Sequence, residues 1–418
     1  MSRQIESLAK RLQFGSVNLC MPNGRQYPLG DGPPYVDWYI HGTHTLRRIL
    51  RNPDPQIGAT YIQGDWDIGP RQLSPFLSIF MRSFPEKIPT GLRRAFMLMT
   101  RQLQQWNLRR RSYHKIARHY DFPEWLYRQF LDQDLQYSCA YFLEPDVSLE
   151  EAQRAKCRLL SKKLCLEPGQ TVLDIGCGWG GLALHLAKHA GVRVTGISLS
   201  REQVQTAQRK AVELGLEKVV NFRVQDYREH RGYYDRIVSV GMFEHVGHSH
   251  FQTFFNKVKE LLSDDGVAVL QTIGRHGPPG RTDPWIRKYI FPGGCCASLS
   301  EVSESIERSG LITADVEVLR LHYAMTLAAW QERFYKNRGR VAQRMGREFC
   351  RMWEFYLAVT ENAFRWQDLV VYQIQLIRQH QSAPLTRHYL YPHQEETPFH
   401  IPYPFAGKPR GTPEEKGQ

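Results

Sequence analysis

An apolar run that contains an acid and passes into alternating glycines constrains this chain more than any other feature. The run covers residues 172–175 and includes Asp174. Gly176, Gly178 and Gly180 follow it at alternate positions. A strand that turns sharply into a helix has this pattern, because glycine permits unusual dihedrals and lets a ligand lie against bare backbone. The acid suits the hydroxyls or the ammonium group of a nucleoside amino acid, so the pattern predicts a site for S-adenosylmethionine (SAM).

Two other nucleotide motifs are excluded by the same stretch. A phosphate-binding Walker loop carries Gly-Lys-Ser or Gly-Lys-Thr, and neither follows here. A dinucleotide fingerprint spaces its glycines as G-x-G-x-x-G, whereas these glycines alternate. A plain structural corner is the remaining alternative, and the flanking strand and helix patterns make it the less favoured one.

Strand-like and helix-like segments alternate from Thr171 to about Val318. The strand candidates are 171–174, 192–197, 219–224, 235–240 and 266–273, and amphipathic segments 181–190, 201–214 and 251–262 lie between them. This alternation predicts an α/β fold with a doubly wound parallel sheet, and ligands of such sheets bind beyond the carboxyl ends of the strands. After about 274 a Pro/Gly-rich insertion interrupts the pattern, and helical segments are expected again near 324–380.

The N-terminal part of the chain predicts a small α+β domain. Residues 17–21 and 35–40 have the pattern of short antiparallel strands, and Asn23-Gly24 is a good hairpin turn. The segment 81–135 is basic and aromatic and is expected to be helical. We therefore expect an N-terminal domain over 1–110, a larger domain with the parallel sheet and helical insertions over 111–380, and an irregular Pro/His-rich tail over 381–418.

The net charge of +13 points to a polyanionic partner, for which nucleic acid and anionic lipid both qualify. Basic residues gather between 101 and 118, but no zinc finger or RNA-recognition signature accompanies them, and a solvated helix face explains them equally well. No window approaches about 20 consecutive apolar residues, so no membrane span is expected. The eight cysteines form no C-x-x-C pair, which fits reduced thiols and a cytoplasmic location.

Further site residues are expected after the second, third and fourth strands. Ser198 and Gln203 lie where many nucleotide sites hold the ribose, and Ser200 with Gln203 also has the spacing of a capping box, a compatible role. Asp226 and Tyr227 offer an acceptor and a ring for adenine, or form a surface turn. Glu244 beside His245 could anchor a general base or pair with a neighbour in a loop. Adjacent Glu and His do not have metal-ligand spacing, so no metal is expected.

The order of these motifs resembles the cyclopropane fatty acid synthase family, which is close to the mycolic acid cyclopropane synthases. The matching blocks are 118–121, 136–142, 172–181, 235–247, 283–286 with 288–292, and 363–365. The resemblance extends over most of the chain, from the N-terminal strands to about residue 380. It implies a Rossmann-like SAM-dependent methyltransferase sheet joined to a lipid-handling N-terminal domain. The implied reaction transfers the SAM methyl group to a cis double bond of a phospholipid acyl chain and then removes a proton to close a three-membered ring.

The resemblance also implies roles for particular residues. SAM would be held by Tyr137, Ser138, Asp174, Gly176, Gly178, Ser198, Leu199 and Gln203, with Asp226 and Tyr227 near the adenine. A bound bicarbonate would serve as the base at Cys139, Glu244, Gln271, Ile273 and Tyr323.

This chain departs from the family pattern at three places. Gln271 replaces the usual His, although plant-type relatives are similar to this chain in having Gln there, and its amide can still donate to an anion. Loss of a proton from a neighbouring carbon would instead give a methylene or methyl-branched product. Pro123-Glu124 stands where many relatives have Gly-Asn, and Thr360 where many have Cys.

The resemblance favours a phospholipid membrane over nucleic acid as the partner of the basic segment, and it is compatible with a homodimer. It predicts a peripheral membrane enzyme that acts on unsaturated acyl chains. A methyltransferase for small molecules stays open as an alternative, although Cys139, Glu244 and Tyr323 argue against it. A protein that binds lipid and SAM without catalysis also stays open, although Asp174 and Glu244 argue against it.

Overall fold

The computed structural model describes residues 2–42, 44–84 and 122–390. They fall into two compact units, one that contains residues 2–84 (the N-terminal unit) and one that contains residues 122–390 (the catalytic unit). The expected domain boundary near residue 110 and the basic cluster at 109–115 lie outside the described residues. Most of the expected tail, from residue 391, lies outside them too.

The N-terminal unit is a small sheet packed against helices. Its strands, β1 (Ser16–Cys20), β2 (Gln26–Gly30), β3 (Tyr35–Ile40) and β4 (Trp66–Ile68), lie in the order β2-β1-β3-β4. Its helices are α1 (Ser2–Arg11), α2 (Thr45–Arg51), α3 (Pro53–Gln63) and α4 (Leu73–Ser83). Trp38 and Trp66 pack on Phe76 of α4, with ring centroids 5.1 and 5.2 Å apart, while Tyr35 and Tyr39 on the same sheet are exposed.

The pairing of these strands corrects one expectation. β1 and β2 form an antiparallel hairpin across the Asn23-Gly24 turn, where Gly24 has a φ of 80°. β1 and β3, however, are parallel, so the expectation that these two runs pair antiparallel is wrong. The unexpected strand β2 takes the antiparallel place beside β1, and the chain then crosses to the other side of β1.

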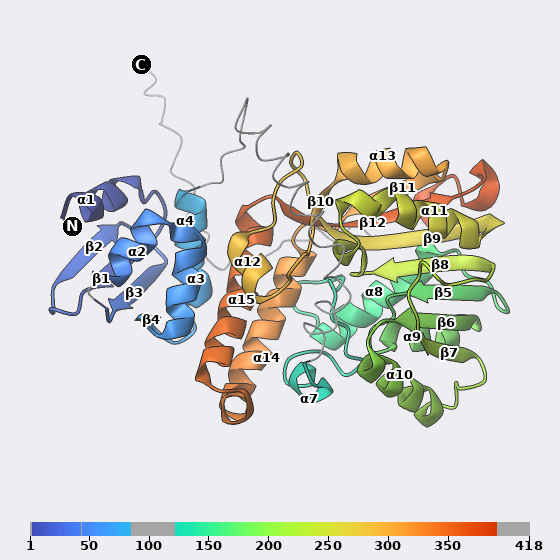
Figure 1. The fold of residues 1–418 in the computed structure, drawn as a ribbon, viewed down its shortest axis with the longest axis horizontal. Coiled ribbons are helices and arrows are strands. Elements are labelled where there is room, and N and C mark those ends of the chain that lie inside the picture. The colour runs from blue at the N-terminus through green and yellow to red at the C-terminus, as the bar shows by residue number, and fades with distance from the viewer. Residues whose placement is uncertain (1, 43, 85–121, 391–418) are drawn as a thin grey trace, which may run out of the picture. The chain divides into compact units, whose positions relative to one another are not determined.

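The catalytic unit contains a large, mostly parallel sheet (Figure 1). Its strands are β5 (Thr171–Ile175), β6 (Arg193–Ser198), β7 (Val220–Val224), β8 (Tyr234–Val240), β9 (Leu262–Arg275), β10 (Ala297–Ser298), β11 (Ile312–Val318) and β12 (Leu369–Ile377). The order is β11-β12-β9-β8-β5-β6-β7, with β10 beside β9. All five expected strands form, and they are parallel to one another, which confirms the expected fold class.

Two features of this sheet were not expected. β12 runs antiparallel to both β9 and β11, so the sheet is mixed at this edge. β12 also lies in a region expected to be helical. The strand is buried almost throughout, so polar residues alternate with apolar ones only over 373–376, and β-branched residues such as Val370, Val371 and Ile374 are the remaining sequence signal.

The helices of the catalytic unit are α7 (Glu124–Tyr127), α8 (Leu149–Lys163), α9 (Gly181–Ala190), α10 (Arg201–Glu213), α11 (Phe251–Leu261), α12 (Pro284–Tyr289), α13 (Leu299–Ser309), α14 (His322–Met345) and α15 (Arg347–Trp366). The three helices expected between strands form as α9, α10 and α11. In the segment 81–135, expected to be helical, the described residues 81–83 belong to α4 and 124–127 form the short α7, while residues 128–148 are irregular.

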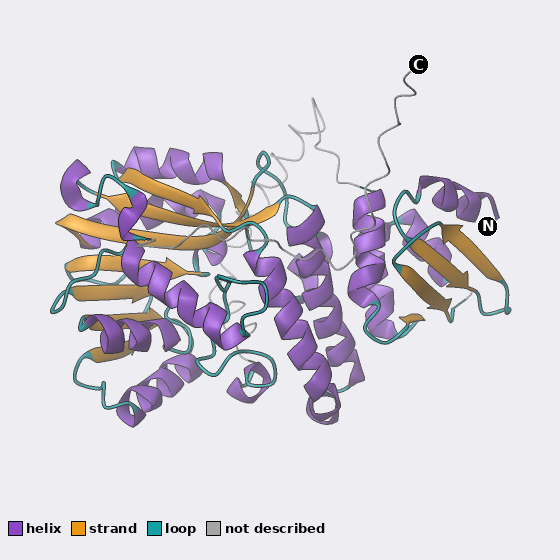
Figure 2. Ribbon diagram, turned by 180° about the vertical axis from the view of Figure 1, so that it is seen from behind, coloured by secondary structure: helices purple, strands orange, loops and turns teal. Residues whose placement is uncertain are grey.

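Helices cover both faces of the sheet (Figure 2). Successive side chains of a strand point to opposite faces. Val172 of β5 accordingly packs with residues of α8, α9 and α10, whereas its neighbour Leu173 packs with residues of α11 and α13. Burial on both faces leaves the loops at the carboxyl ends of the strands as the accessible place for polar, ligand-binding residues.

Candidate active site

The carboxyl ends of β5, β6 and β8 border a cavity of about 500 Å³, here called the large cavity, a size typical of small-molecule sites. All ten residues expected to hold SAM line it, namely Tyr137, Ser138, Asp174, Gly176, Gly178, Ser198, Leu199, Gln203, Asp226 and Tyr227. The structure thus brings the ten residues together, while their individual contacts with SAM stay predictions.

The glycine loop after β5 forms a bare backbone wall. Gly176 and Gly178 have φ values of 85° and 52°, a region that side chains other than glycine rarely adopt. A Cβ on Gly176 would lie 2.6 Å from Cβ of Met242, whereas one on Gly178 would meet nothing within 4 Å. The first glycine therefore permits close packing, and the second leaves open space beside the cavity.

Asp174 brings a buried carboxyl group to this wall. Its Oδ2 makes no hydrogen bond with any described residue. Burial raises its pKa to about 7, and attraction to Lys156 opposes that rise. Because an unpaired buried carboxyl group is costly, it fits a ligand that brings hydroxyls or a positive charge, as SAM does.

The loops after β6 and β7 supply the remaining polar wall. Ser200 accepts a hydrogen bond from the backbone N–H of Gln203 at 3.3 Å, which confirms the expected helix cap. Ser198 Oγ donates to Gln203 Oε1 at 3.0 Å, so the cap and the cavity share one residue. Asp226 is paired with Arg228, and the ring of Tyr227 packs edge-on against a phenylalanine of α11.

A second cavity of about 80 Å³, here called the small cavity, is lined by all five residues expected to bind the base. They are Cys139, Glu244, Gln271, Ile273 and Tyr323. Tyr137, Ser138, Gly241 and His245 line both cavities, so the two adjoin.

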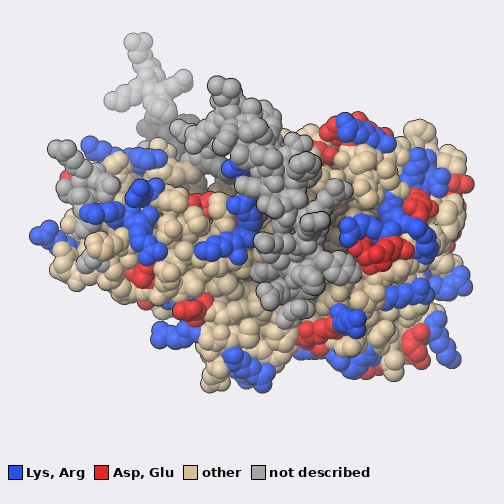
Figure 3. Space-filling view, viewed as in Figure 1, with Lys and Arg blue, Asp and Glu red and all other residues tan. Residues whose placement is uncertain are grey.

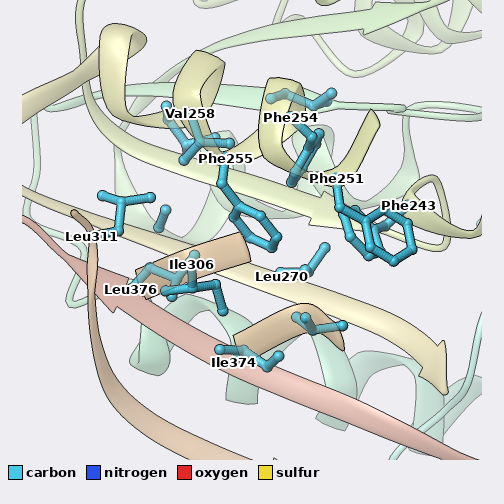
Figure 4. Close-up of a cluster of buried hydrophobic side chains, with 14 of the residues drawn as sticks. Phe243, Phe251, Phe254, Phe255, Val258, Leu270, Ile306, Leu311, Ile374 and Leu376 are labelled. Carbon is cyan, nitrogen blue, oxygen red and sulfur yellow. The ribbon is translucent and has the colours of Figure 1, made fainter. Parts of the chain in front are cut away.

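Glu244 is held by a short 3-10 turn, Phe243–His245, that follows β8. Phe243 is fully buried and stacks on Phe251 with ring centroids 4.3 Å apart, in the cluster shown in Figure 4. Oε1 of Glu244 accepts a hydrogen bond from the backbone N–H of Ile273 at 2.5 Å. Oε2 is buried without a hydrogen-bond partner among the described residues. Burial raises the pKa of Glu244 to about 6, and the hydrogen bond from Ile273 opposes that rise.

The other polar groups of the small cavity come from the loop before α8 and from β9. Burial raises the pKa of the Cys139 thiol, so the thiol stays neutral and unreactive. Gln271 donates through Nε2 to the carbonyl oxygen of Cys139 at 3.3 Å. Cys139 can therefore contribute to a site through its backbone rather than through its sulfur.

Aromatic rings enclose the region where the two cavities adjoin. Tyr137 stacks on Trp330 with centroids 5.2 Å apart, and its hydroxyl lies 2.9 Å from that of Tyr356. Tyr323 packs against Trp330 and Phe364 at 5.8 and 4.8 Å. Ring faces stabilise cations and exclude water, so this wall suits a positively charged reaction intermediate.

The site also contains a residue that sequence analysis missed. Lys156 of α8 is fully buried, and its Nζ donates to Gln136 Oε1 at 2.6 Å and to Ser138 Oγ at 3.0 Å. It thereby fixes the loop that carries Tyr137 between the cavities. Nothing in the sequence distinguishes this lysine from the solvated lysines of an amphipathic helix. The described part of the chain contains no cluster of three or more possible metal ligands.

The sheet is doubly wound, its strand β5 carries an acid near its carboxyl end, and a glycine wall follows beside a cavity of this size. These features together define a SAM-dependent methyltransferase. Residues 107–374 match the family model described as mycolic acid cyclopropane synthetase, and the chain belongs to this family.

Comparisons with individual proteins agree with this assignment. The chain is 36% identical over 345 residues to the cyclopropane-fatty-acyl-phospholipid synthase of Escherichia coli, which covers 82% of this chain and 88% of that protein. It is 34% identical over 357 residues to the tuberculostearic acid methyltransferase UfaA1 of Mycobacterium tuberculosis, which covers 82% and 83%. Among solved structures, mycolic acid cyclopropane synthase CmaA1 complexed with SAH and CTAB matches with a TM-score of 0.60 and 33% identity, over 63% of this chain and 97% of that one.

Proposed function

We propose that this enzyme transfers the methyl group of SAM to the cis double bond of an unsaturated phospholipid acyl chain and closes a cyclopropane ring. The observation that carries the proposal is the adjoining pair of cavities, one walled by the glycine loop and Asp174, the other by Glu244, with aromatic rings where they meet. The relative from Escherichia coli is named for this reaction, which supports the proposal.

The chemistry explains why such a site must be dry. The electron pair of the double bond forms a bond to the methyl carbon while the bond between that carbon and sulfur breaks. A carbocation remains on the acyl chain, and water would quench it. A C–H bond of the new methyl group then donates its electrons to the cationic carbon, and the proton leaves. The rings of Tyr137 and Tyr323, which line the small cavity, would shield the cation and face it with π electrons.

We propose that bicarbonate binds in the small cavity and supplies the base that accepts this proton. The unpaired Oε2 of Glu244 and the amide of Gln271 fit a small oxyanion, because a carboxyl group with a raised pKa can donate a hydrogen bond when protonated. The backbone N–H of Cys139 would be a further donor. The residues would orient the base, and the aromatic wall would keep water from replacing it.

We also propose that the enzyme works at the cytoplasmic surface of a membrane, with the segment Arg109–Lys115 in contact with anionic lipid. None of the helices in the described ranges has the length and apolar character that a membrane crossing requires. On the face of the catalytic unit seen in Figure 3, basic and acidic side chains are interspersed. The basic segment is the docking candidate that the sequence offers. Charge reversal in this segment should weaken binding to anionic vesicles, and unchanged binding would contradict the idea.

A homodimer, testable by sedimentation, is a further proposal.

The experiment that tests the proposed function is mass spectrometry of phospholipid acyl chains after incubation with SAM, bicarbonate and unsaturated vesicles. A gain of one CH₂ together with high-field ring protons in the NMR spectrum is the expected result. The absence of any gain on lipid would contradict the proposal and favour a small-molecule substrate.

A methylene or methyl-branched product is the second outcome that this experiment distinguishes, and the sequence and the comparisons support it. Gln271 departs from the usual His, and one relative is named a tuberculostearic acid methyltransferase. A gain of CH₂ without ring protons would mean that the proton leaves from a neighbouring carbon and that the product is a methylene or methyl-branched chain.

A further inference from the structure

A short chain of hydrogen bonds runs from the small cavity into the sheet. Gln271 of β9 donates through Nε2 to the carbonyl oxygen of Cys139 at 3.3 Å. Gln373 of β12 donates through Nε2 to Oε1 of Gln271 at 2.9 Å. The two glutamines are directly opposite each other in the antiparallel pairing of these strands, and Gln373 is fully buried.

The backbone carbonyl of Cys139 fixes the direction of this chain. A carbonyl oxygen can only accept, so Gln271 must turn its NH₂ group toward Cys139. The carbonyl oxygen of Gln271 then faces Gln373, which must donate. An amide NH₂ group has two hydrogens, and Cys139 takes one of them. In this orientation the second hydrogen is available to an anion in the small cavity.

The alternative orientation of Gln271 would have the opposite effect on an anion. An amide rotated by half a turn presents its oxygen where the NH₂ group was, and that oxygen repels an oxyanion and the Cys139 carbonyl alike. A glutamine is therefore useful in this position only if its rotation is fixed. The carbonyl of Cys139 holds one end of the Gln271 amide and the NH₂ group of Gln373 holds the other, so loss of Gln373 would remove one of the two contacts that fix this rotation. Gln373 itself is not among the residues that line the small cavity.

We propose that Gln373 is a positioning residue that holds the NH₂ group of Gln271 toward a small oxyanion. The inference rests on the proposed bicarbonate site and assigns this chain a replacement for the more usual His. Gln271 and Gln373, on two strands, together would present one fixed N–H donor to the anion, as a single imidazole would do alone.

The test compares Gln373→Leu and Gln373→Glu with the wild-type enzyme. Leucine removes the donor, and a carboxylate attracts the NH₂ group of Gln271 away from the cavity. We expect Gln373→Leu to raise the KM for bicarbonate about tenfold, the effect of one hydrogen bond to a charged group, with a smaller change in kcat. Gln373→Glu should raise this KM further at a pH where its buried carboxyl group is ionised, because a protonated carboxyl group would donate to Gln271 as the amide does. The Kd for SAM should stay within about twofold of the wild-type value in both variants.

Gln375→Leu provides a matched control. Gln375 lies two residues further along β12, is equally buried and donates to a backbone carbonyl, that of Lys163, at 2.6 Å. It has no contact with Gln271, so its loss should lower stability without changing the KM for bicarbonate. Thermal unfolding of each variant shows whether it folds, and Gln373→Met replaces Gln373→Leu if the latter does not.

Three results would overturn the inference. Folded Gln373 variants with an unchanged KM for bicarbonate would contradict it and leave the proposed base intact. An equal rise of KM in Gln375→Leu would reduce Gln373 to a structural role. A wild-type rate that does not depend on bicarbonate would contradict the proposed base and, with it, this inference.

Discussion

The two cavities of the catalytic unit differ in how their lining residues are spread along the chain. The large cavity includes an unbroken run from Asp174 to Trp179, and Ser198 follows the neighbouring strand. The small cavity has no run longer than three residues, and its lining comes from six separate segments, with Glu244, Gln271 and Tyr323 on three of them. We therefore expect cofactor binding to depend most on the short local conformation of the glycine loop, and proton removal to depend on the assembled fold. The two functions should therefore be separable by mutation.

The largest effect is expected from Glu244→Gln. Loss of the carboxyl group should lower cyclopropane formation roughly 10³-fold, within the range known for acid–base groups, while the Kd for SAM stays within about twofold. Mass spectrometry of acyl chains and calorimetry with SAM measure the two quantities. The exposed Glu260, changed to Gln, is the control. If Glu244→Gln also abolished SAM binding, the two cavities would not be functionally separate.

Gly176→Ala should have the converse effect and weaken the binding of SAM. The added Cβ would lie 2.6 Å from Met242 in a backbone conformation that alanine disfavours, so we expect the Kd for SAM to rise about 10–100-fold. Gly169 has a similar φ of 86° but no atom within 4 Å of an added Cβ, and it does not line the large cavity. Gly169→Ala therefore controls for backbone strain alone. Equal losses of SAM affinity in both variants would show that the close packing at Gly176 is unimportant.

Asp174→Asn tests the electrostatic side of the large cavity. The folded-state pKa of about 7 lies above the ordinary value of 3.8, so the folded protein binds this proton more tightly than the unfolded chain. The contribution of Asp174 to stability is therefore greatest below pH 4, falls between about pH 4 and 7, and stays low above pH 7. Asn should raise the free energy of unfolding at pH 8 by on the order of 4 kcal/mol and change it little at pH 4.

Denaturant unfolding of the ligand-free protein at the two pH values measures this difference. The same variant should bind SAM about tenfold more weakly, since it lacks the charge. A variant that is less stable than the wild type at pH 8 would show that the buried carboxylate is already stabilised by its surroundings.

The smallest effect is expected from Thr360→Ala. Thr360 lines neither cavity, and its buried Oγ1 has no hydrogen-bond partner among the described residues. Removal of an unpaired hydroxyl costs little, so cyclopropane formation should stay within about twofold of the wild-type rate. A tenfold loss in the same acyl-chain assay would mean that the position takes part in catalysis despite the absence of Cys.

The same contrast explains how far the sequence predicts this molecule. The strand, acid and glycines of 171–181 are contiguous, so the glycine wall of the large cavity could be predicted from local pattern, whereas Tyr137 and Ser138 came only from the family resemblance. Most of the parallel sheet followed from the alternation of strand and helix patterns over 171–318. Gln271 and Ile273 look like ordinary strand residues, and only the family resemblance singled them out. Sequence analysis did not identify Lys156 and Gln373, because their hydrogen-bond partners are distant in the sequence. Gln373, for example, bonds to a residue 102 positions away.

The errors in strand prediction have a similar cause. β12 is buried on both faces, and the parallel place of β3 beside β1 depends on pairing between separate segments rather than on a local pattern.

The central claim is that SAM binding and proton removal occur in separate cavities, and removal of bicarbonate tests it most directly. The wild-type enzyme is placed in carbonate-free buffer with SAM and unsaturated vesicles, and bicarbonate is then added back in steps. The account predicts a Kd for SAM that does not change, together with cyclopropane formation that is low at first and rises to saturation. Cyclopropane formation that is unaffected by bicarbonate, or a Kd for SAM that follows the bicarbonate concentration, would contradict it.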